Sequence, residues 1–138
     1  MNKQDFEDLV GIRITEAKLL LDNQCPQGAY YLSGYALESA LKASICQQVR
    51  ENDFPDKKLA LACHTHNLKE LIGVAGLKQK LTEQENADEE FKLNWAVAKD
   101  WSETTRYETD IDQIKANDLY EAITNEESGV LKWLKNYW

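Results

Sequence analysis

Residues that break secondary structure are scarce in this chain. Only six Gly and two Pro occur among its 138 residues. Because strand-and-turn architectures need many turn residues, this scarcity favours long helices. A chain of this length can build one hydrophobic core but not two domains of ordinary size. We therefore expect a single all-α domain over residues 1–138.

Apolar residues recur with helical spacing in the first half of the chain. A stripe from about Gln4 to Asn23 predicts a first helix, which Cys25-Pro26-Gln27-Gly28 ends. The segment from Ala29 to about Arg50 is apolar on nearly every side, which is typical of a central, buried helix. A break follows over Asn52–Asp56. Small residues in the central segment would let a neighbouring helix approach closely: Ser33, Gly34 and Ala36.

Three further helices are predicted in the second half. A short one has Leu68, Leu71 and Ile72 as its apolar face. Thr82-Glu83-Gln84-Glu85 has the form of a capping box and predicts a helix that reaches Trp101.

The last predicted helix starts at Asp118-Leu119-Tyr120-Glu121, a second capping-box-like run, and extends to Trp138. Gly129 inside it weakens that prediction. Residues 102–112 indicate an irregular connection or a frayed helix end. Together these segments predict four or five helices in an up-and-down bundle.

Charge and hydropathy limit the classes of partner. The net charge of −8 disfavours broad coating of nucleic acid, although a local site with Lys and Arg on one face stays possible. No stretch approaches the roughly 18 apolar residues of a membrane span, and Met1 to Glu7 lacks a signal-peptide core. Three cysteines without regular spacing predict no disulfide framework. We expect a cytoplasmic protein with no membrane contact.

Three motifs in order resemble those of HEPN domains, the higher eukaryotes and prokaryotes nucleotide-binding domains. The run from Ala29 to Ala43 resembles the second helix of that family, where many members carry a stretch of the form "A-Y-x-x-x-x-x-x-E-x-x-L-K-A". His66-Asn67-Leu68-Lys69-Glu70-Leu71 is similar to the "H-x-L-x-x-L" that opens its third helix. Trp101 to Arg106-Tyr107 is similar to a "W…R-Y" before its last helix.

The resemblance implies an all-α, HEPN-like bundle, often a homodimer, connected with nucleotide or RNA biology in prokaryotes. It also implies possible pairing with a nucleotidyltransferase and a toxin–antitoxin or defence setting. Catalytic members of the family are metal-independent ribonucleases. They carry an Arg that is followed four to six residues later by a His.

This chain lacks that catalytic pair. Its histidines are His64 and His66, and neither follows an arginine at the required spacing. General acid–base cleavage of RNA needs an imidazole that exchanges protons near neutrality. Acidic side chains near Arg106 would also repel the scissile phosphate. The positions where the histidine would stand after Arg106 hold Asp110, Ile111 and Asp112.

Charged and aromatic residues within the three motifs form the candidate ligand site. Glu38 and Lys42 are four positions apart, so they either pair with each other or line a polar pocket with His66 and Arg106. Arg106 either grips an anion while Tyr107 stacks on a base, or is neutralised by nearby acids. The candidate ligand-binding residues are Tyr35, Glu38, Lys42, His66, Arg106 and Tyr107.

Metal and cofactor sites are not expected. Cys63-His64-Thr65-His66 offers possible ligands, but no second Cys/His pair exists to complete a zinc site. The aromatic residues Trp133, Tyr137 and Trp138 near the C-terminus predict packing either against the core or in a dimer interface.

Three functions are consistent with these patterns. The first is a non-catalytic HEPN-like module that binds a nucleotide, an RNA end or a partner protein. The second is a protein–protein interaction subunit, paired with a nucleotidyltransferase, that has no ligand site of its own. The third is a metal-independent ribonuclease with rearranged catalytic residues.

Overall fold

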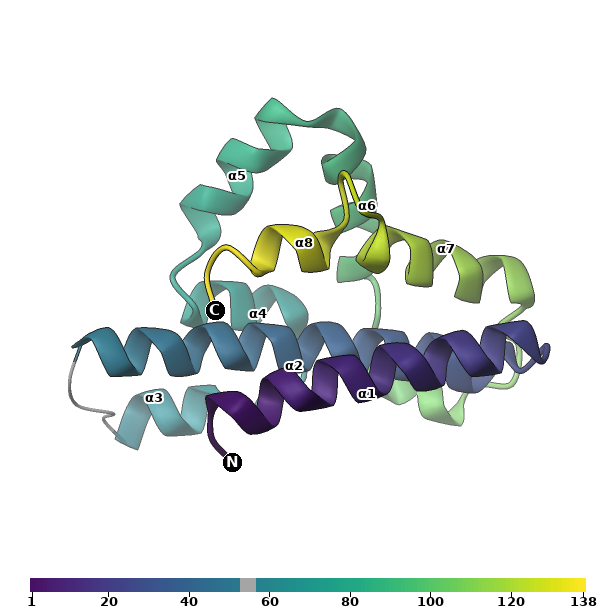
Figure 1. Ribbon diagram of the computed structural model, residues 1–138, viewed down its shortest axis with the longest axis horizontal. Helices are drawn as coiled ribbons and strands as arrows, with labels where there is room; N and C mark the ends of the chain where they lie inside the picture. The colour runs from purple at the N-terminus through teal and green to yellow at the C-terminus, as the bar shows by residue number, and fades with distance from the viewer. Residues whose placement is uncertain (53–56) are drawn as a thin grey trace.

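The computed structural model describes residues 1–52 and 57–138, and every regular element within them is a helix (Figure 1). This confirms the all-α prediction. Of the predicted break, residues 53–56 lie outside the described residues. In chain order the elements are α1 (Lys3–Asp22), α2 (Pro26–Asn52), α3 (Lys57–Ala62), α4 (Leu68–Val74), α5 (Lys78–Ala87), α6 (Glu89–Lys99), the 3-10 helix η1 (Glu103–Tyr107), α7 (Gln113–Thr124) and α8 (Val130–Leu134).

The first two helices form an antiparallel pair along the long axis of the molecule (Figure 1). Asn2 and Asp5 form a capping box at the start of α1. Helix α2 starts at Pro26, earlier than the predicted Ala29, because proline suits the first helical turn, where its missing N–H has no partner to lose. The two helices therefore need only a short connection between them.

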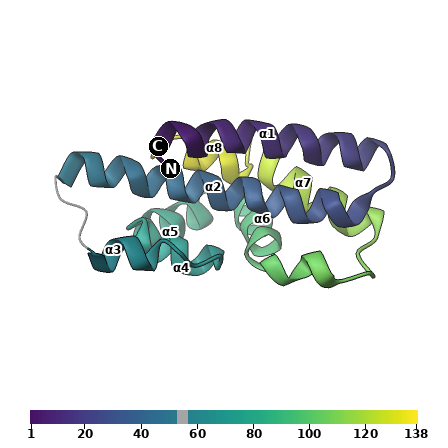
Figure 2. The ribbon, with the colours of Figure 1, turned by 90° about the horizontal axis from the view of Figure 1, so that it is seen from below.

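Helix α2 is the centre of the fold, as its all-round apolar sequence predicts. Ala36, Leu37, Ala40 and Leu41 are fully buried. Helices α1, α4, α7 and α8 and the 3-10 helix η1 all pack against it, and α6 packs on α7 (Figures 1 and 2). One hydrophobic cluster runs through these contacts.

Two predicted helix starts are wrong. Thr82 lies inside α5, where its hydroxyl donates to the carbonyl of Lys78. Asp118 lies inside α7. The actual N-caps are Asp88 for α6 and Asp112 for α7, whose carboxylates accept the backbone N–H groups three residues on. A capping sequence acts only where the preceding backbone leaves the helix. The helices that contain Thr82 and Asp118, α5 and α7, begin upstream of these residues and bury Leu81 and Ala116 there.

The predicted last helix is two helices. Helix α7 ends at Thr124, and the side chain of Asn125 accepts the backbone N–H groups of Glu127 and Ser128 in the connection. Gly129 then caps α8, and a Cβ atom there would overlap the backbone of Asn125. Gly129 therefore marks a turn of closely packed backbone.

The described residues hold eight α-helices, more than the four or five expected. The additional ones are short. Helix α3 buries no residue, so its sequence has no apolar stripe from which a helix could be predicted. The 3-10 helix η1 lies within the segment predicted as irregular. Within the described residues, none of the helices combines the length and the apolar character needed to cross a membrane.

Candidate functional site

One face of the central helix carries a row of polar and aromatic side chains. Tyr31, Tyr35, Glu38 and Lys42 follow one another at helical spacings of four, three and four positions on α2. Side chains three or four positions apart lie on the same side of a helix. The segment before α4 approaches this face through His66, and the segment before η1 approaches it through Trp101. The 3-10 helix η1 itself also packs on α2. We refer to this row of side chains as the polar face of α2.

Glu38 is the buried centre of this face, with a relative exposure of only 4%. One carboxylate oxygen, Oε1, lies 2.6 Å from Nδ1 of His66. The other, Oε2, lies 3.5 Å from the ammonium of Lys42. A buried carboxylate needs such partners to offset the loss of hydration. The predicted ion pair between Glu38 and Lys42 is thus present, and His66 completes it.

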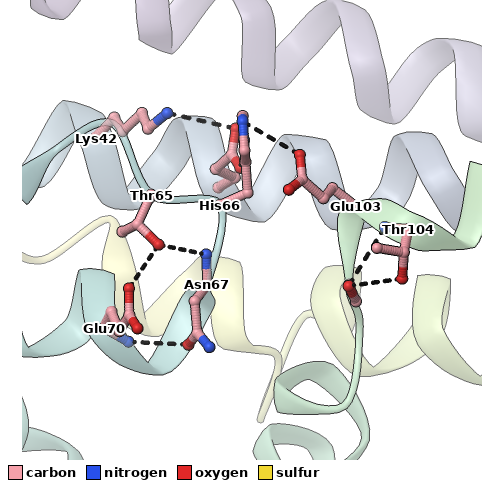
Figure 3. A network of polar contacts seen from close by, with 9 residues as sticks. Lys42, Thr65, His66, Asn67, Glu70, Glu103 and Thr104 are labelled. Atoms are coloured by element: carbon pink, nitrogen blue, oxygen red, sulfur yellow. Dashed lines mark hydrogen bonds and ion pairs between the residues drawn. The ribbon is translucent and has the colours of Figure 1, made fainter.

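His66 joins the central helix to η1 (Figure 3). Its Nδ1 contacts Glu38, and its Nε2 lies 3.2 Å from Oε2 of Glu103. An imidazole has only these two nitrogens for hydrogen bonding or proton transfer. With a carboxylate at each of them, His66 has no nitrogen left for a ligand.

Local hydrogen bonds fix the backbone on both sides of His66 (Figure 3). The Asn67 side chain caps α4 by accepting the backbone N–H of Glu70 at 3.1 Å. The hydroxyl of Thr65 accepts the backbone N–H of Asn67 and donates to the Glu70 carboxylate at 2.6 Å. His66 therefore stands in a hydrogen-bonded turn at the start of α4, and its ring is held between Glu38 and Glu103.

Trp101 closes the site from the other side. It is 3% exposed, and its indole lies directly on the backbone of Gly34, where a Cβ atom would overlap the ring. Gly34 thus permits a close approach, but the group that packs on it is a side chain from the connection between α6 and η1 and not the neighbouring helix that the sequence predicts. The Trp101 ring contacts the Tyr35 ring edge-on, with the two ring centroids 5.5 Å apart. Burial is the main cause that raises the pKa of Tyr35 well above its ordinary value, and a hydrogen bond with Tyr31 is the second cause.

Arg106 and Tyr107 form an exposed pair at the end of η1. The guanidinium carbon of Arg106 lies 4.7 Å from the ring centroid of Tyr107, which is 74% exposed. A hydrogen bond with the Tyr31 hydroxyl raises the pKa of Arg106, which stays a cation. Residues three apart in a 3-10 helix eclipse each other, so Glu103 and Arg106 share one side of η1.

A recess of about 240 Å³ opens between the segment before α4 and η1. Its lining residues carry hydroxyl, amide, imidazole, carboxylate and indole groups. The residues that line it are Thr65, His66, Asn67, Trp101, Ser102 and Glu103.

The structure brings together four of the six predicted ligand-site residues. Tyr35, Glu38, Lys42 and His66 lie in one connected group. Arg106 and Tyr107 connect to it through Tyr31 and not through Glu38.

The site residues that sequence reasoning did not select include Tyr31 and Glu103. Tyr31 continues the spacing of Tyr35, Glu38 and Lys42, so this pattern could have identified it. Glu103 carries no comparable sequence signal, because its place depends on how η1 docks.

The aromatic residues near the C-terminus pack within the chain itself. Trp133 is 5% exposed and contacts the rings of Phe91 and Tyr137, with centroids 5.3 Å and 5.5 Å away. Tyr137 and Trp138 are partly buried against the core. This is the first of the two roles expected for them, and a dimer contact through the exposed parts of Tyr137 and Trp138 stays a prediction.

Within the described ranges, no three His, Cys, Asp or Glu side chains are grouped so that they could hold a metal ion. Comparisons with protein-family models, with curated proteins and with solved structures found no match to this chain. The site is therefore interpreted from its own chemistry.

Proposed function

We propose that this chain is a non-catalytic, HEPN-like binding module that takes a nucleotide or the end of an RNA. The observation that carries the proposal is the exposed Arg106–Tyr107 pair, connected through Tyr31 to the polar face of α2. A guanidinium binds phosphate oxygens with paired hydrogen bonds, and an exposed aromatic ring stacks on a base. The recess beside His66 adds hydroxyl and amide groups within the same region.

The charge around the pair restricts the ligand. Glu103, Glu108 and Asp110 stand near Arg106 in the sequence, and the chain carries a net charge of −8. A long phosphate backbone would meet these acids, whereas one or two phosphates at Arg106 need not. The proposal therefore concerns a mononucleotide or a chain end, and binding should weaken as salt concentration rises.

Binding suits this site better than cleavage. Both ring nitrogens of His66 already contact carboxylates, at 2.6 Å and 3.2 Å. A general base must instead reach the proton that it removes. Ribonuclease activity would require His66 to leave Glu38 or Glu103, or the exposed His64 to act from a neighbouring position.

Isothermal titration calorimetry with AMP, GMP, CMP, UMP and a short single-stranded RNA tests the proposal. We expect at least one of these ligands to bind. Arg106→Ala should then weaken binding by about tenfold or more, because it removes a charged hydrogen-bond donor. The matched control is Arg13→Ala on α1, which removes a cation that pairs with Glu16 far along the chain from the site. It should leave the affinity unchanged.

Two results would overturn the proposal. One is the absence of any heat of binding with all five ligands at millimolar concentration. The other is cleavage of the RNA by the purified protein that His66→Ala abolishes, which would favour the ribonuclease with rearranged residues.

A second candidate function is that of an interaction subunit, as a homodimer or beside a nucleotidyltransferase. Large apolar side chains that stay exposed favour it, because such residues gather at protein interfaces. This function predicts no nucleotide binding in the calorimetric experiment. The exposed residues include Ile12, Leu19, Leu61, Leu93, Val97 and Ile114.

A further inference from the structure

Three large apolar side chains remain exposed on the paired helices α6 and α7. Leu93 and Val97 on α6 are 60% and 39% exposed, and Ile114 on α7 is 72% exposed. The core-facing sides of both helices are already filled by other residues, among them Trp95 and Leu119. The three exposed side chains are therefore not needed for the hydrophobic core of this chain.

These side chains border a groove between the two helices. Val97 and Ile114 line the same recess of about 350 Å³, whose inner wall is the ring of Tyr30. Leu93 stands one helical turn before Val97 and extends the apolar edge along α6. We call this the α6–α7 groove. Apolar side chains on two adjoining helices, beside a recess with charged residues in its lining, are a surface onto which an amphipathic helix can dock.

The rim of the α6–α7 groove is acidic. Asp100, Asp112 and Asp118 all line it, and in the part of the chain that the structure describes none of them forms an ion pair. Among the described residues that line the recess, the cation is Lys115, whose ammonium lies 5.3 Å from the ring centroid of Tyr30. Burial, together with the negative charges of Glu108 and Asp100, raises the pKa of Tyr30, as expected in a negative field.

We propose that the α6–α7 groove docks a basic amphipathic helix of another protein. Its apolar face would cover Leu93, Val97 and Ile114, and its Lys or Arg side chains would meet the acidic rim. Charge complementarity of this kind selects the partner and speeds its association. A second copy of this chain fits less well, because a two-fold contact through the groove would place acids against acids.

This surface is separate from the proposed nucleotide site. Tyr30 faces the groove, whereas its neighbour Tyr31 belongs to the polar face of α2. Successive residues of a helix point about 100° apart, so the two tyrosines face different sides. The inference therefore holds or fails independently of nucleotide binding.

Fluorescence anisotropy with a labelled synthetic peptide tests the inference. The probe is a helical peptide of Leu and Lys in amphipathic order, and its counterpart has Glu in place of every Lys. At an ionic strength of about 0.15 M, where long-range attraction is screened, the basic peptide should bind the full chain and the acidic one should not.

Matched substitutions locate the contact. Ile114→Ser should weaken binding of the basic peptide by about tenfold or more, as for an apolar anchor at the centre of an interface. Ile12→Ser is the matched control, because Ile12 is also an exposed isoleucine, at 50%, but lies on α1. It should not change peptide binding. Asp118→Asn should weaken binding and Asp8→Asn on α1 should not. Arg106→Ala should leave peptide binding unchanged.

Three results would overturn the inference. The first is equal weakening by Ile114→Ser and Ile12→Ser, which would indicate non-specific adsorption of the peptide. The second is equally tight binding of the acidic peptide. The third is self-association of the free protein, seen by light scattering and abolished by Ile114→Ser, which would assign the groove to a second copy.

Discussion

At the scale of single residues, Glu38 is the most constrained polar group of the candidate site. It sits on a helix whose other side chains are mostly buried, and its carboxylate has two partners, Lys42 and His66. The first partner is local, four positions along the same helix. The second comes from a distant segment and requires the fold. Removing that second partner leaves a buried carboxylate oxygen without its hydrogen bond.

We therefore predict that His66→Ala lowers the free energy of unfolding by about 1–3 kcal/mol, the cost of an unsatisfied buried acceptor. Glu103→Gln should lower it by no more than about 1 kcal/mol, because the Glu103 side chain is 37% exposed and water can replace the contact. Urea unfolding followed by circular dichroism measures both values. Equal losses in the two variants would contradict the central role of Glu38.

Single residues also show where sequence reasoning succeeds. The spacing of Glu38 and Lys42 predicts an ion pair, and the structure contains it at 3.5 Å. The small size of Gly34 predicts a close approach, and the indole of Trp101 makes it. The sequence could not identify Trp101 as the approaching group. The small size of Gly34 shows only that a neighbour has room to approach, not which residue does so.

At the scale of elements, Asp88 ties two parts of the chain together. One carboxylate oxygen caps α6 by accepting the backbone N–H of Phe91 at 3.1 Å. The other accepts the hydroxyl of Ser128, in the connection between α7 and α8, at 2.8 Å. These hydrogen bonds to the charged form lower the pKa of Asp88 below its ordinary value of 3.8.

The lowered pKa of Asp88 sets the sign of a pH effect. A carboxylate with a depressed pKa in the folded state stabilises the fold above its unfolded pKa, and this stabilisation is lost as pH falls through the folded value. We predict that the melting temperature of the native chain falls more between pH 7 and pH 3 than that of Asp88→Asn, which cannot titrate. Thermal unfolding by circular dichroism at both pH values checks this. Parallel decreases would contradict it.

Elements also show why predicted helix boundaries fail. The runs that begin at Thr82 and Asp118 have the composition of capping boxes, yet both lie within helices. A residue acts as an N-cap only where the backbone changes direction at the start of a helix. That change of direction occurs where the run of buried apolar residues ends. Burial is a property of the packed molecule, so the sequence identifies the helices better than it identifies their ends.

At the scale of the whole molecule, α2 holds the fold together through contacts with α1, α4, α7 and α8. Two short helices differ sharply in how they join this assembly. Helix α3 buries none of its residues, whereas α8 buries Val130, Leu131, Trp133 and Leu134. Short helices are marginal on their own, so tertiary burial decides whether they persist.

We predict that the amides of α3 exchange with solvent through local opening while those of α8 exchange only when the whole molecule unfolds. Hydrogen–deuterium exchange with mass spectrometry measures both segments in one experiment. Addition of a low concentration of urea should speed exchange in α8 and change that in α3 little. Equal protection of the two helices would show that α3 is held by contacts that its exposure does not indicate.

Helical periodicity and all-round apolarity are properties of consecutive residues, so the helical character of this chain and the central place of α2 could be predicted from the sequence. It also placed Glu38 next to Lys42. The sequence also offers His66 as a candidate neighbour of this pair, but the contacts of His66 with Glu38 and Glu103 form only in the packed fold. Those residues come from segments far apart in the chain, and their meeting depends on how helices pack around a shared core, which no local spacing encodes.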